Sequence, residues 1–420
     1  MDGRDGDPGG MLPLISEPEY RCPGDRKPIS QAVHLARLAS GHVACRQCDQ
    51  RSDTGSLPKS VVKSLRGRPR EPDFLIDADE GIRGRSINEL TRERMECFVL
   101  AILDLVDRDR LCSTVDAAGS VGPLKVQIGL DSRLDSPDLM VGVVQALQQS
   151  AVEIIDVGEL SRPAFDFAID RFRPQIGIYV TGGNRPSGWN GMDLIDSAGL
   201  PWLTPERQTE FLQRLDSSVV RLNRTAGRYQ VAEILRDYEL HLANQFHALR
   251  PLRIGVDCPE PGLRRFLQQL LERTPCDPRF LQSGVLYSSE RGTKSLADLV
   301  CEFHLDLGVS ISPDGRGGRF YDETGAELEP SQFVRLFLQQ YPDVTEEDRR
   351  KSVDLISSSG SERVRRERQR AAKLPVLIDE KRRCCFLGES PECDVFQTFA
   401  RLLEVMSLSE RPLSWIANNR

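Results

Sequence analysis

Four side chains in the first fifty residues combine types and spacing that suit a bound metal. They follow the pattern C-x11-H-x10-C-x2-C, formed by Cys22, His34, Cys45 and Cys48. A CxxC pair is the usual half of a tetrahedral zinc site, and the preceding cysteine and histidine supply the other two ligand types. A structural zinc ion would explain how so short a segment folds. His42 competes for the imidazole position, and the alternatives are a redox-active CxxC pair or cysteines without a joint role.

A second set of candidate residues lies in four short segments rich in Gly, Arg and Asp. These segments are Asp79–Gly84, Gly129–Pro137, Thr181–Asp193 and Ser312–Gly317. Most of them adjoin a predicted strand, so the ends of strands would present their side chains.

The elements that must position these segments alternate between strands and helices. Strands are predicted at 124–129, 152–157, 175–180, 252–256, 306–312, 353–356, 375–378 and 383–387. Helices are predicted at 87–106, 136–150, 163–172, 262–273, 330–340, 361–373 and 395–408. This alternation indicates βαβ units and an α/β fold with mixed, mostly parallel sheets.

The predicted organisation has a short N-terminal part and three α/β domains. The expected boundaries are a disordered segment at 1–20, a Cys/His segment at 21–50, a linker at 51–72, and domains at 73–222, 223–325 and 326–420, the last of them truncated.

In their order, the four segments resemble the signature loops of the phosphohexomutase superfamily, the phosphoglucomutase and phosphomannomutase type. Asp79–Gly84 resembles its TDGIRG segment, and Gly129–Pro137 resembles GRDTRLSSP. Thr181–Asp193 resembles the phosphoserine loop TASHNPxxxNGxK, and Ser312–Gly317 resembles the metal loop DPDGDR. The resemblance covers residues 73–420 and implies three consecutive domains of that type, with the family's fourth, phosphate-binding domain expected to be absent.

The resemblance also implies a chemistry that this chain does not fully support. Family members move a phosphoryl group between sugar positions, using a phosphorylated serine and a magnesium ion held by three aspartates. Here Gly183 stands at the serine position, Asn184 at the neighbouring histidine position and Asp193 at the lysine position. No catalytic residue of the phosphoserine loop is therefore intact.

The metal loop departs in the same way. Of its aspartates only Asp314 remains, between Ser312 and Arg316. An arginine repels a divalent cation, which argues against magnesium. Arg316 could instead supply the positive charge of the missing metal, or it could be a solvated side chain. We favour the solvated side chain. The sugar-recognition loop retains only its Gly-Glu-Ser start, which includes Glu389 and Ser390.

We therefore expect a phosphohexomutase-like pseudoenzyme that binds a phosphosugar-like ligand, another anion or a protein partner. The candidate ligand-binding residues are Arg83, Arg133, Thr181, Arg185, Asn190, Glu389 and Ser390. Clustered guanidinium groups suit a phosphate or carboxylate. The competing interpretation is that these arginines are scaffolding, paired with Asp131, Asp135 and Asp193.

Two other functions stay open. The first is a divergent but active mutase in carbohydrate metabolism, with Thr181 or Ser187 as the replacement hydroxyl. The second is an adaptor that uses the zinc-type segment to tether the degenerate domains.

Composition narrows the class of protein. The net charge of −7 argues against nucleic acid as a partner, and the basic-acidic segment 361–373 is expected to be a solvated helix. No apolar run is long enough to span a membrane, and residues 1–13 lack the pattern of a secretory signal, so we expect a cytoplasmic protein. Its eleven cysteines are then expected to be free of disulfides.

Overall fold

The chain forms two compact units, Met1–Asp73 and Phe74–Arg420. The structure, a computed structural model, describes residues 20–22, 27–40, 42–46, 48–66, 74–77, 79, 81–86, 89–114, 123–216, 227–281, 288–289, 292–293, 295–341, 343–345, 347–348, 350–351, 374–379, 381–386 and 393–419. Of the segment predicted to be disordered, only Tyr20 is described, and the elements predicted at 353–356 and 361–373 lie outside the described residues.

The first unit is built from short helices. They are α1 (Gln31–Ser40), the 3-10 helices η1 (Val43–Arg46) and η2 (Asp49–Ser52), and α2 (Lys59–Arg66). Before α1, Tyr20 and Ile29 face each other in an isolated antiparallel bridge. Helix α2 lies inside the segment 51–72 that was predicted to be a linker.

A mixed seven-stranded sheet begins the second unit. Its order is β1-β2-β6-β5-β3-β4-β7. The strands are β1 (Leu75–Asp77), β2 (Gly81–Arg85), β3 (Lys125–Leu130), β4 (Glu153–Glu159), β5 (Ile176–Val180), β6 (Trp189–Asp196) and β7 (Arg228–Val231). Strands β5, β3, β4 and β7 run parallel, whereas β1, β2 and β6 pair antiparallel.

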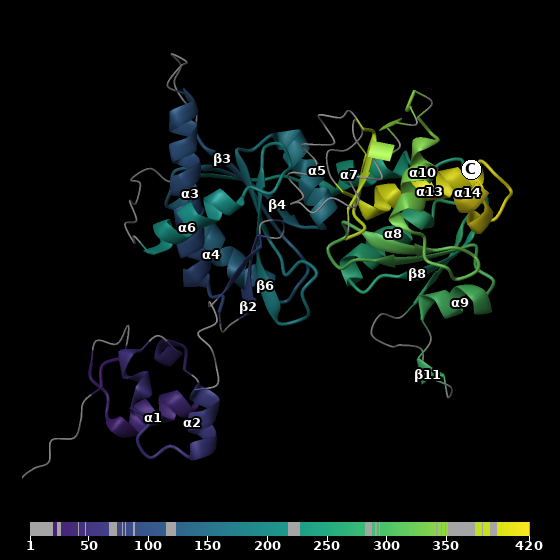
Figure 1. Ribbon diagram of the computed structural model, residues 1–420. Coiled ribbons are helices and arrows are strands. Elements are labelled where there is room, and N and C mark those ends of the chain that lie inside the picture. Colours follow the sequence, from purple (N-terminus) through teal and green to yellow (C-terminus); the bar gives the residue numbers. More distant parts are fainter. Residues whose placement is uncertain are drawn as a thin grey trace, which may run out of the picture. The chain divides into compact units, whose positions relative to one another are not determined.

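Helices cover both faces of this sheet (Figure 1). They are α3 (Arg92–Thr114), α4 (Ser136–Gln148) and α6 (Pro205–Asp216) on one face, and α5 (Arg162–Phe172) on the other. The first three helices share a hydrophobic core with inward side chains such as Ile128 and Ile178. The core under α5 continues without interruption into the rest of the unit.

A four-stranded sheet with the order β13-β12-β8-β9 follows. Its strands are β8 (Arg253–Asp257), β9 (Asp277–Phe280), β12 (Leu307–Ile311) and β13 (Gly318–Tyr321). The helices of this part of the chain are α7 (Leu235–Ala243), α8 (Pro261–Leu271) and α9 (Leu296–Glu302). The short hairpin of β10 (Ser288–Ser289) and β11 (Gly292–Thr293) precedes α9. Both sheets are mixed, with parallel strands at their centres, as the sequence predicted.

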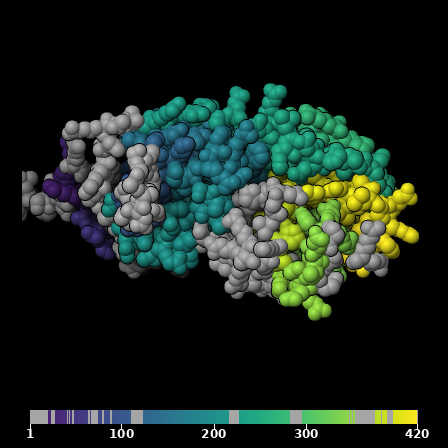
Figure 2. Space-filling view, turned by 90° about the horizontal axis from the view of Figure 1, so that it is seen from above, coloured from purple at the N-terminus to yellow at the C-terminus, as the bar shows by residue number. Residues whose placement is uncertain are grey.

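The last part of the chain completes the same core. Its elements are α10 (Pro330–Leu338), β14 (Val376–Ile378), β15 (Cys384–Phe386), α13 (Val395–Ser407) and α14 (Leu413–Asn419). Figure 2 shows the yellow end of the chain, with α13 and α14, lying against the teal and green middle of the chain. Buried Phe399 and Phe320 are in ring contact, which ties α13 to the four-stranded sheet.

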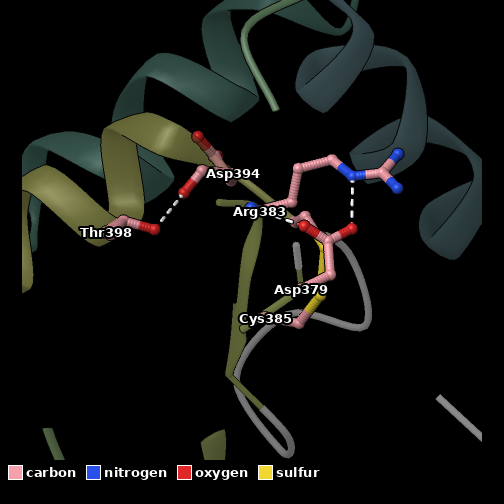
Figure 3. Close-up of a disulfide and its surroundings, with 6 residues drawn as sticks. Asp379, Arg383, Cys385, Asp394 and Thr398 are labelled. Atoms are coloured by element: carbon pink, nitrogen blue, oxygen red, sulfur yellow. Dashed lines mark hydrogen bonds and ion pairs between the residues drawn. A yellow bond between two sulfur atoms is a disulfide. The ribbon is translucent and has the colours of Figure 1, made fainter. Parts of the chain in front are cut away.

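The expectation that no disulfide forms is wrong at one position. Cys385 and Cys393 face each other in an isolated antiparallel bridge and are joined by a disulfide (Figure 3). Spacing alone could not reveal the pairing, because the bridge depends on the chain turning back after β15. Beside it, Arg383 Nε donates to Asp379 at 2.7 Å.

No helix in the described part of the chain combines the length and the apolar character that crossing a bilayer requires.

Candidate functional site

The central residue of the candidate site is Asp193 on β6. Antiparallel pairing sets Asp193 opposite Tyr179 of β5, and sets Gly191 of the same strand opposite Arg83 of β2. Arg83 Nη2 donates to Asp193 Oδ1, and the Arg83 side chain is only 1% exposed. Three strands therefore hold a buried ion pair at the position where the resemblance implies a lysine.

A second arginine, Arg162 of α5, also binds the Asp193 carboxylate. Helix α5 begins after Ser161, whose hydroxyl caps the Ala164 N–H. Its first residue, Arg162, donates through Nη1 to Asp193 Oδ2 and through Nε to Asp166 at 2.9 Å. Burial raises the pKa of Asp193, but the charges of Arg83 and Arg162 outweigh that effect and leave the pKa below its ordinary value.

Arg316 joins this buried cluster. The favoured expectation that it is solvated is wrong, because it is 3% exposed. Its charge acts on both Asp193 and Arg162, so the loop after β12 reaches the same cluster as β2, β6 and α5. Burial is tolerated because carboxylates stand among the guanidinium groups.

The turn at Gly182 and Gly183 has no room for larger residues. A Cβ built on Gly182 would lie 2.3 Å from the Arg133 guanidinium. Gly183 has φ +54°, and a Cβ there would lie 3.0 Å from Arg83 Nη2. The residue at the serine position therefore closes a tight turn directly against Arg83.

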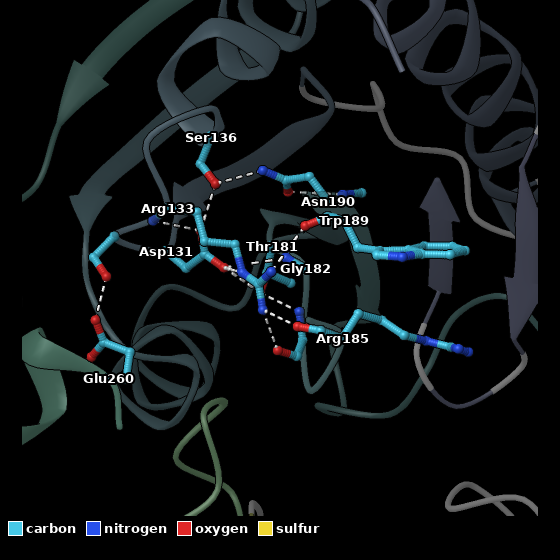
Figure 4. A network of polar contacts seen from close by, with 12 residues as sticks. Asp131, Arg133, Ser136, Thr181, Gly182, Arg185, Trp189, Asn190 and Glu260 are labelled. Atoms are coloured by element: carbon cyan, nitrogen blue, oxygen red, sulfur yellow. Dashed lines mark hydrogen bonds and ion pairs between the residues drawn. The ribbon is translucent and has the colours of Figure 1, made fainter. Parts of the chain in front are cut away.

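Asp131, at the end of β3, organises the loop that follows β5 (Figure 4). It accepts from the Thr181 hydroxyl at 2.7 Å and from the Gly182 N–H at 3.2 Å. Its other oxygen accepts from the Ser136 hydroxyl, which in turn accepts from Asn190 Nδ2 at 2.9 Å. The candidate residues Thr181 and Asn190 are thus buried in a network within the protein.

Arg133 binds this loop through both of its Nη groups. Its Nε lies 3.2 Å from Asp131 Oδ2. Nη1 donates to the carbonyls of Pro186 and Trp189, at 3.2 and 2.9 Å, and Nη2 to those of Gly183 and Arg185, both at 2.8 Å. Both Nη groups of Arg133 are therefore used within the protein, and Nε faces Asp131, so this guanidinium is committed to the loop and not to a ligand.

The remaining candidates do not join Asp131. Arg185 extends alongside the Trp189 ring, 5.5 Å from its centroid and away from Asp131 (Figure 4). Glu389 and Ser390 lie outside the described residues. Asp135, suggested as an arginine partner, precedes α4, and the Arg133 partner is Asp131 instead.

The degenerate metal loop is closed on itself and on the neighbouring loop. The Ser312 hydroxyl donates to Asp314 and lies 2.7 Å from the Gly317 carbonyl. Asn184 Nδ2 donates to the other Asp314 oxygen at 3.0 Å. The two signature loops therefore face one cleft, and both oxygens of the remaining aspartate have protein partners.

Beside these loops lies a cavity of about 210 Å³. It opens at the carboxyl ends of β3, β4 and β5, the place where open α/β sheets bind ligands. Four carboxylates and two arginines line it: Asp131, Glu159, Glu260, Asp314, Arg162 and Arg265. Three rings complete the wall: Tyr179, Tyr238 and Phe266.

Two side-chain contacts join the walls of this cavity, one polar and one aromatic. The Ser132 hydroxyl, after β3, donates to Glu260, and Glu260 also caps α8 by accepting from the Gly262 N–H at 3.0 Å. On the other side Tyr238 stacks on Phe266, with centroids 5.4 Å apart. The cavity is therefore bounded by segments attached to the seven-stranded and the four-stranded sheets.

The sequence analysis missed several of these residues. Arg162 and Asp166 lie i,i+4 at the start of α5, a spacing typical of a solvated helix face. Glu260 and Tyr238 belong to no motif, and the Ser161-Arg162-Pro163 helix start was the only available signal.

The fold and the site define an α/β protein with signature loops gathered around a cleft at the ends of parallel strands. Comparison with known proteins agrees with this class. Residues 77–215 match the family described as phosphoglucomutase/phosphomannomutase, alpha/beta/alpha domain I. A phosphomannomutase/phosphoglucomutase of Pseudomonas putida is 26% identical over 227 residues, which are 52% of this chain and 48% of the relative.

Solved structures share the fold at lower identity. A phosphoglucomutase/phosphomannomutase family protein of Burkholderia thailandensis has a TM-score of 0.65 at 17% identity, covering 81% of this chain and 80% of that one. Parafusin, a phosphoglucomutase of Paramecium, has a TM-score of 0.57 at 12% identity, covering 82% and 74%. Residues 77–215 thus match the first domain of the phosphoglucomutase/phosphomannomutase family, and the chain shares the fold of these solved structures. It spans about half the length of the curated relatives it matches.

Proposed function

We propose that this chain is a non-catalytic phosphohexomutase relative whose cleft binds a small hydroxyl-rich ligand of the sugar class. The observation that carries the proposal is the ion-pair cluster around Asp193. Arg83 and Arg162 both contact this carboxylate, so the charges that could hold a phosphoryl group are already compensated.

The loops support the loss of phosphoryl transfer. Transfer requires a hydroxyl that carries the phosphoryl group and a cation that offsets its charge. Gly183 has no hydroxyl and lies against Arg83, and Asp314 is engaged by Ser312 and Asn184. Magnesium therefore has no part in the proposed function.

The lining of the cavity indicates the ligand. Among the described lining residues, carboxylates outnumber arginines, which disfavours an anion, and carboxylate oxygens accept hydrogen bonds from hydroxyl groups. The rings of Tyr179, Tyr238 and Phe266 supply apolar faces. An uncharged hexose fits this chemistry better than a hexose phosphate.

Calorimetric titration with glucose, mannose and their 1- and 6-phosphates tests the proposal. We expect heat with a free sugar, and weaker binding of its phosphates. Leu235→Trp, on the cavity wall, should reduce the affinity at least tenfold. Leu240→Trp, equally exposed on the same helix but outside the cavity, is the matched control. No heat with any sugar, or equal effects of the two variants, would refute the proposal.

An active mutase with Thr181 as nucleophile is the second candidate. One observation favours it: the Thr181 hydroxyl lines the cavity and donates to Asp131, a carboxylate that could accept its proton. Ser187, in contrast, is exposed. A coupled assay with glucose 1-phosphate or mannose 1-phosphate and magnesium should show no turnover. Turnover together with phosphate mapped to Thr181 would establish this alternative instead.

A further inference from the structure

The interior of the first unit is made of thiols and an imidazole. Cys22, Cys45 and Cys48 are 4–6% exposed, and His34 is fully buried. Among the described residues of this unit, only Tyr20 and Leu38 are other buried hydrophobic side chains. So little apolar surface does not stabilise a fold of this size by itself.

His34 is held with one nitrogen free. Its Nε2 lies 2.9 Å from the Asp53 carbonyl oxygen, which can only accept, so Nε2 carries the proton. Its Nδ1 is buried and has no hydrogen-bond partner. Tyr20 fixes the ring by stacking on it at 4.2 Å and donates its hydroxyl to the Asp53 side chain.

This arrangement is typical of a histidine that binds a metal. In such sites one ring nitrogen donates to a carbonyl or carboxylate, which fixes the tautomer and directs the lone pair of the other nitrogen to the ion. A buried lone pair without a partner is otherwise unfavourable. His42, the competing imidazole, is exposed.

The three thiols are close to one another. The Cys45 thiol interacts with those of both Cys22 and Cys48. Cys45 lies in η1, and Cys48 immediately precedes η2, so two short helical turns present the CxxC pair.

We propose that Cys22, Cys45 and Cys48, as thiolates, and His34 through Nδ1 bind one structural zinc ion in the first unit. Three sulfurs and one imidazole nitrogen form a closed tetrahedral set, which suits zinc. Among the described residues, no three His, Cys, Asp or Glu side chains are arranged so that they could hold a metal ion as they stand. Binding therefore requires side-chain rotation around the thiols, and it releases thiol protons.

Metal analysis of the purified full chain tests the site. We expect about one zinc ion per chain, reduced by more than half in Cys45→Ser and Cys22→Ser. Cys97→Ser and Cys301→Ser remove exposed thiols of the second unit and should keep the zinc. His42→Ala should also keep it.

Cobalt exchange covers the case in which a ligand variant misfolds. The Co²⁺-loaded wild-type chain should show thiolate charge-transfer bands and the visible absorption of tetrahedral cobalt. His34→Cys should retain the metal with a shifted spectrum, because it exchanges one ligand for another. Less than about half a zinc per chain with a featureless cobalt spectrum would overturn the proposal. A disulfide between Cys45 and Cys48 in a metal-free chain would overturn it in favour of a redox pair.

Discussion

Asp193 shows how one acidic residue can change the use of a site. A lysine there would stand beside Arg83 and Arg162, and three like charges would repel one another inside the protein. The carboxylate instead contacts both guanidinium groups. Asp193 thus joins β2, β6 and α5 at the position where the phosphohexomutase resemblance implies a lysine.

Replacing this carboxylate should be costly. Asp193→Asn leaves Arg83 buried without a compensating charge and leaves Arg162 with Asp166 alone, so we expect a loss of about 3–5 kcal/mol in unfolding free energy. Urea denaturation followed by circular dichroism measures it. Asp170→Asn removes the partner of the exposed Arg173 and should change stability by less than about 0.5 kcal/mol.

The two variants must differ for this interpretation to hold. If Asp193→Asn costs no more than Asp170→Asn, the cluster does not stabilise the second unit. The sequence placed Asp193 in one of the four signature segments but could not reveal Arg162, because no spacing rule links α5 to β6.

At the scale of elements, the path of the loop between β5 and β6 is set by side chains that lie outside the loop. Arg133 donates to four of its carbonyls, and Asp131 accepts from its first residues. The loop therefore depends on the turn between β3 and α4 for its path.

Arg133→Met should loosen this loop while leaving the sheet intact. Methionine retains much of the apolar stem and removes every donor. We expect amide hydrogen exchange across residues 182–189 to accelerate at least tenfold, with little change in β3 or β5. Arg173→Met, which removes an exposed ion pair, is the control. Unchanged exchange in the loop would show that its path does not depend on Arg133.

The apolar pattern of each strand explains whether the sequence could predict it. The strands predicted at 124–129, 152–157 and 175–180 agree with β3, β4 and β5 to within about two residues, because they are nearly continuous apolar runs. β6 was missed because Asn190 and Asp193 interrupt its apolar pattern. Both are buried for polar contacts that only the folded chain supplies.

At the scale of the molecule, Tyr238 and Asp394 join parts of the chain far apart in sequence. The Tyr238 hydroxyl of α7 donates to Asp394 at 2.7 Å, and Asp394 caps α13 by accepting from the Phe396 N–H. Burial raises the pKa of Asp394 to about 6, although these hydrogen bonds lower it. Compared with the unfolded chain, the folded protein therefore favours the protonated form of the Asp394 carboxyl group.

This shift predicts a pH dependence of stability. The contribution of Asp394 is fully present below its unfolded pKa of about 4 and is lost as the pH rises through about 6. Its loss amounts to roughly 3 kcal/mol over that interval. Asparagine still accepts the capping hydrogen bonds, so Asp394→Asn should abolish this part of the decline.

Urea unfolding at a series of pH values from about 4 to 7 compares the two proteins. The difference in unfolding free energy between Asp394→Asn and wild type should shift in favour of the variant as the pH rises. A constant difference would contradict the raised pKa. The sequence could predict α13 but not this pair, since 156 residues separate its members.

The contacts of Arg133 have a consequence for how this cleft can change. A carbonyl oxygen is the same whichever residue carries it, so Arg133 specifies the path from Arg185 to Trp189 without reference to the side chains along it. An exposed position such as Ser187 is then free to be exchanged as part of a recognition surface on a constant frame. A loop that has lost its reactive residue can in this way keep its outline and acquire a different ligand.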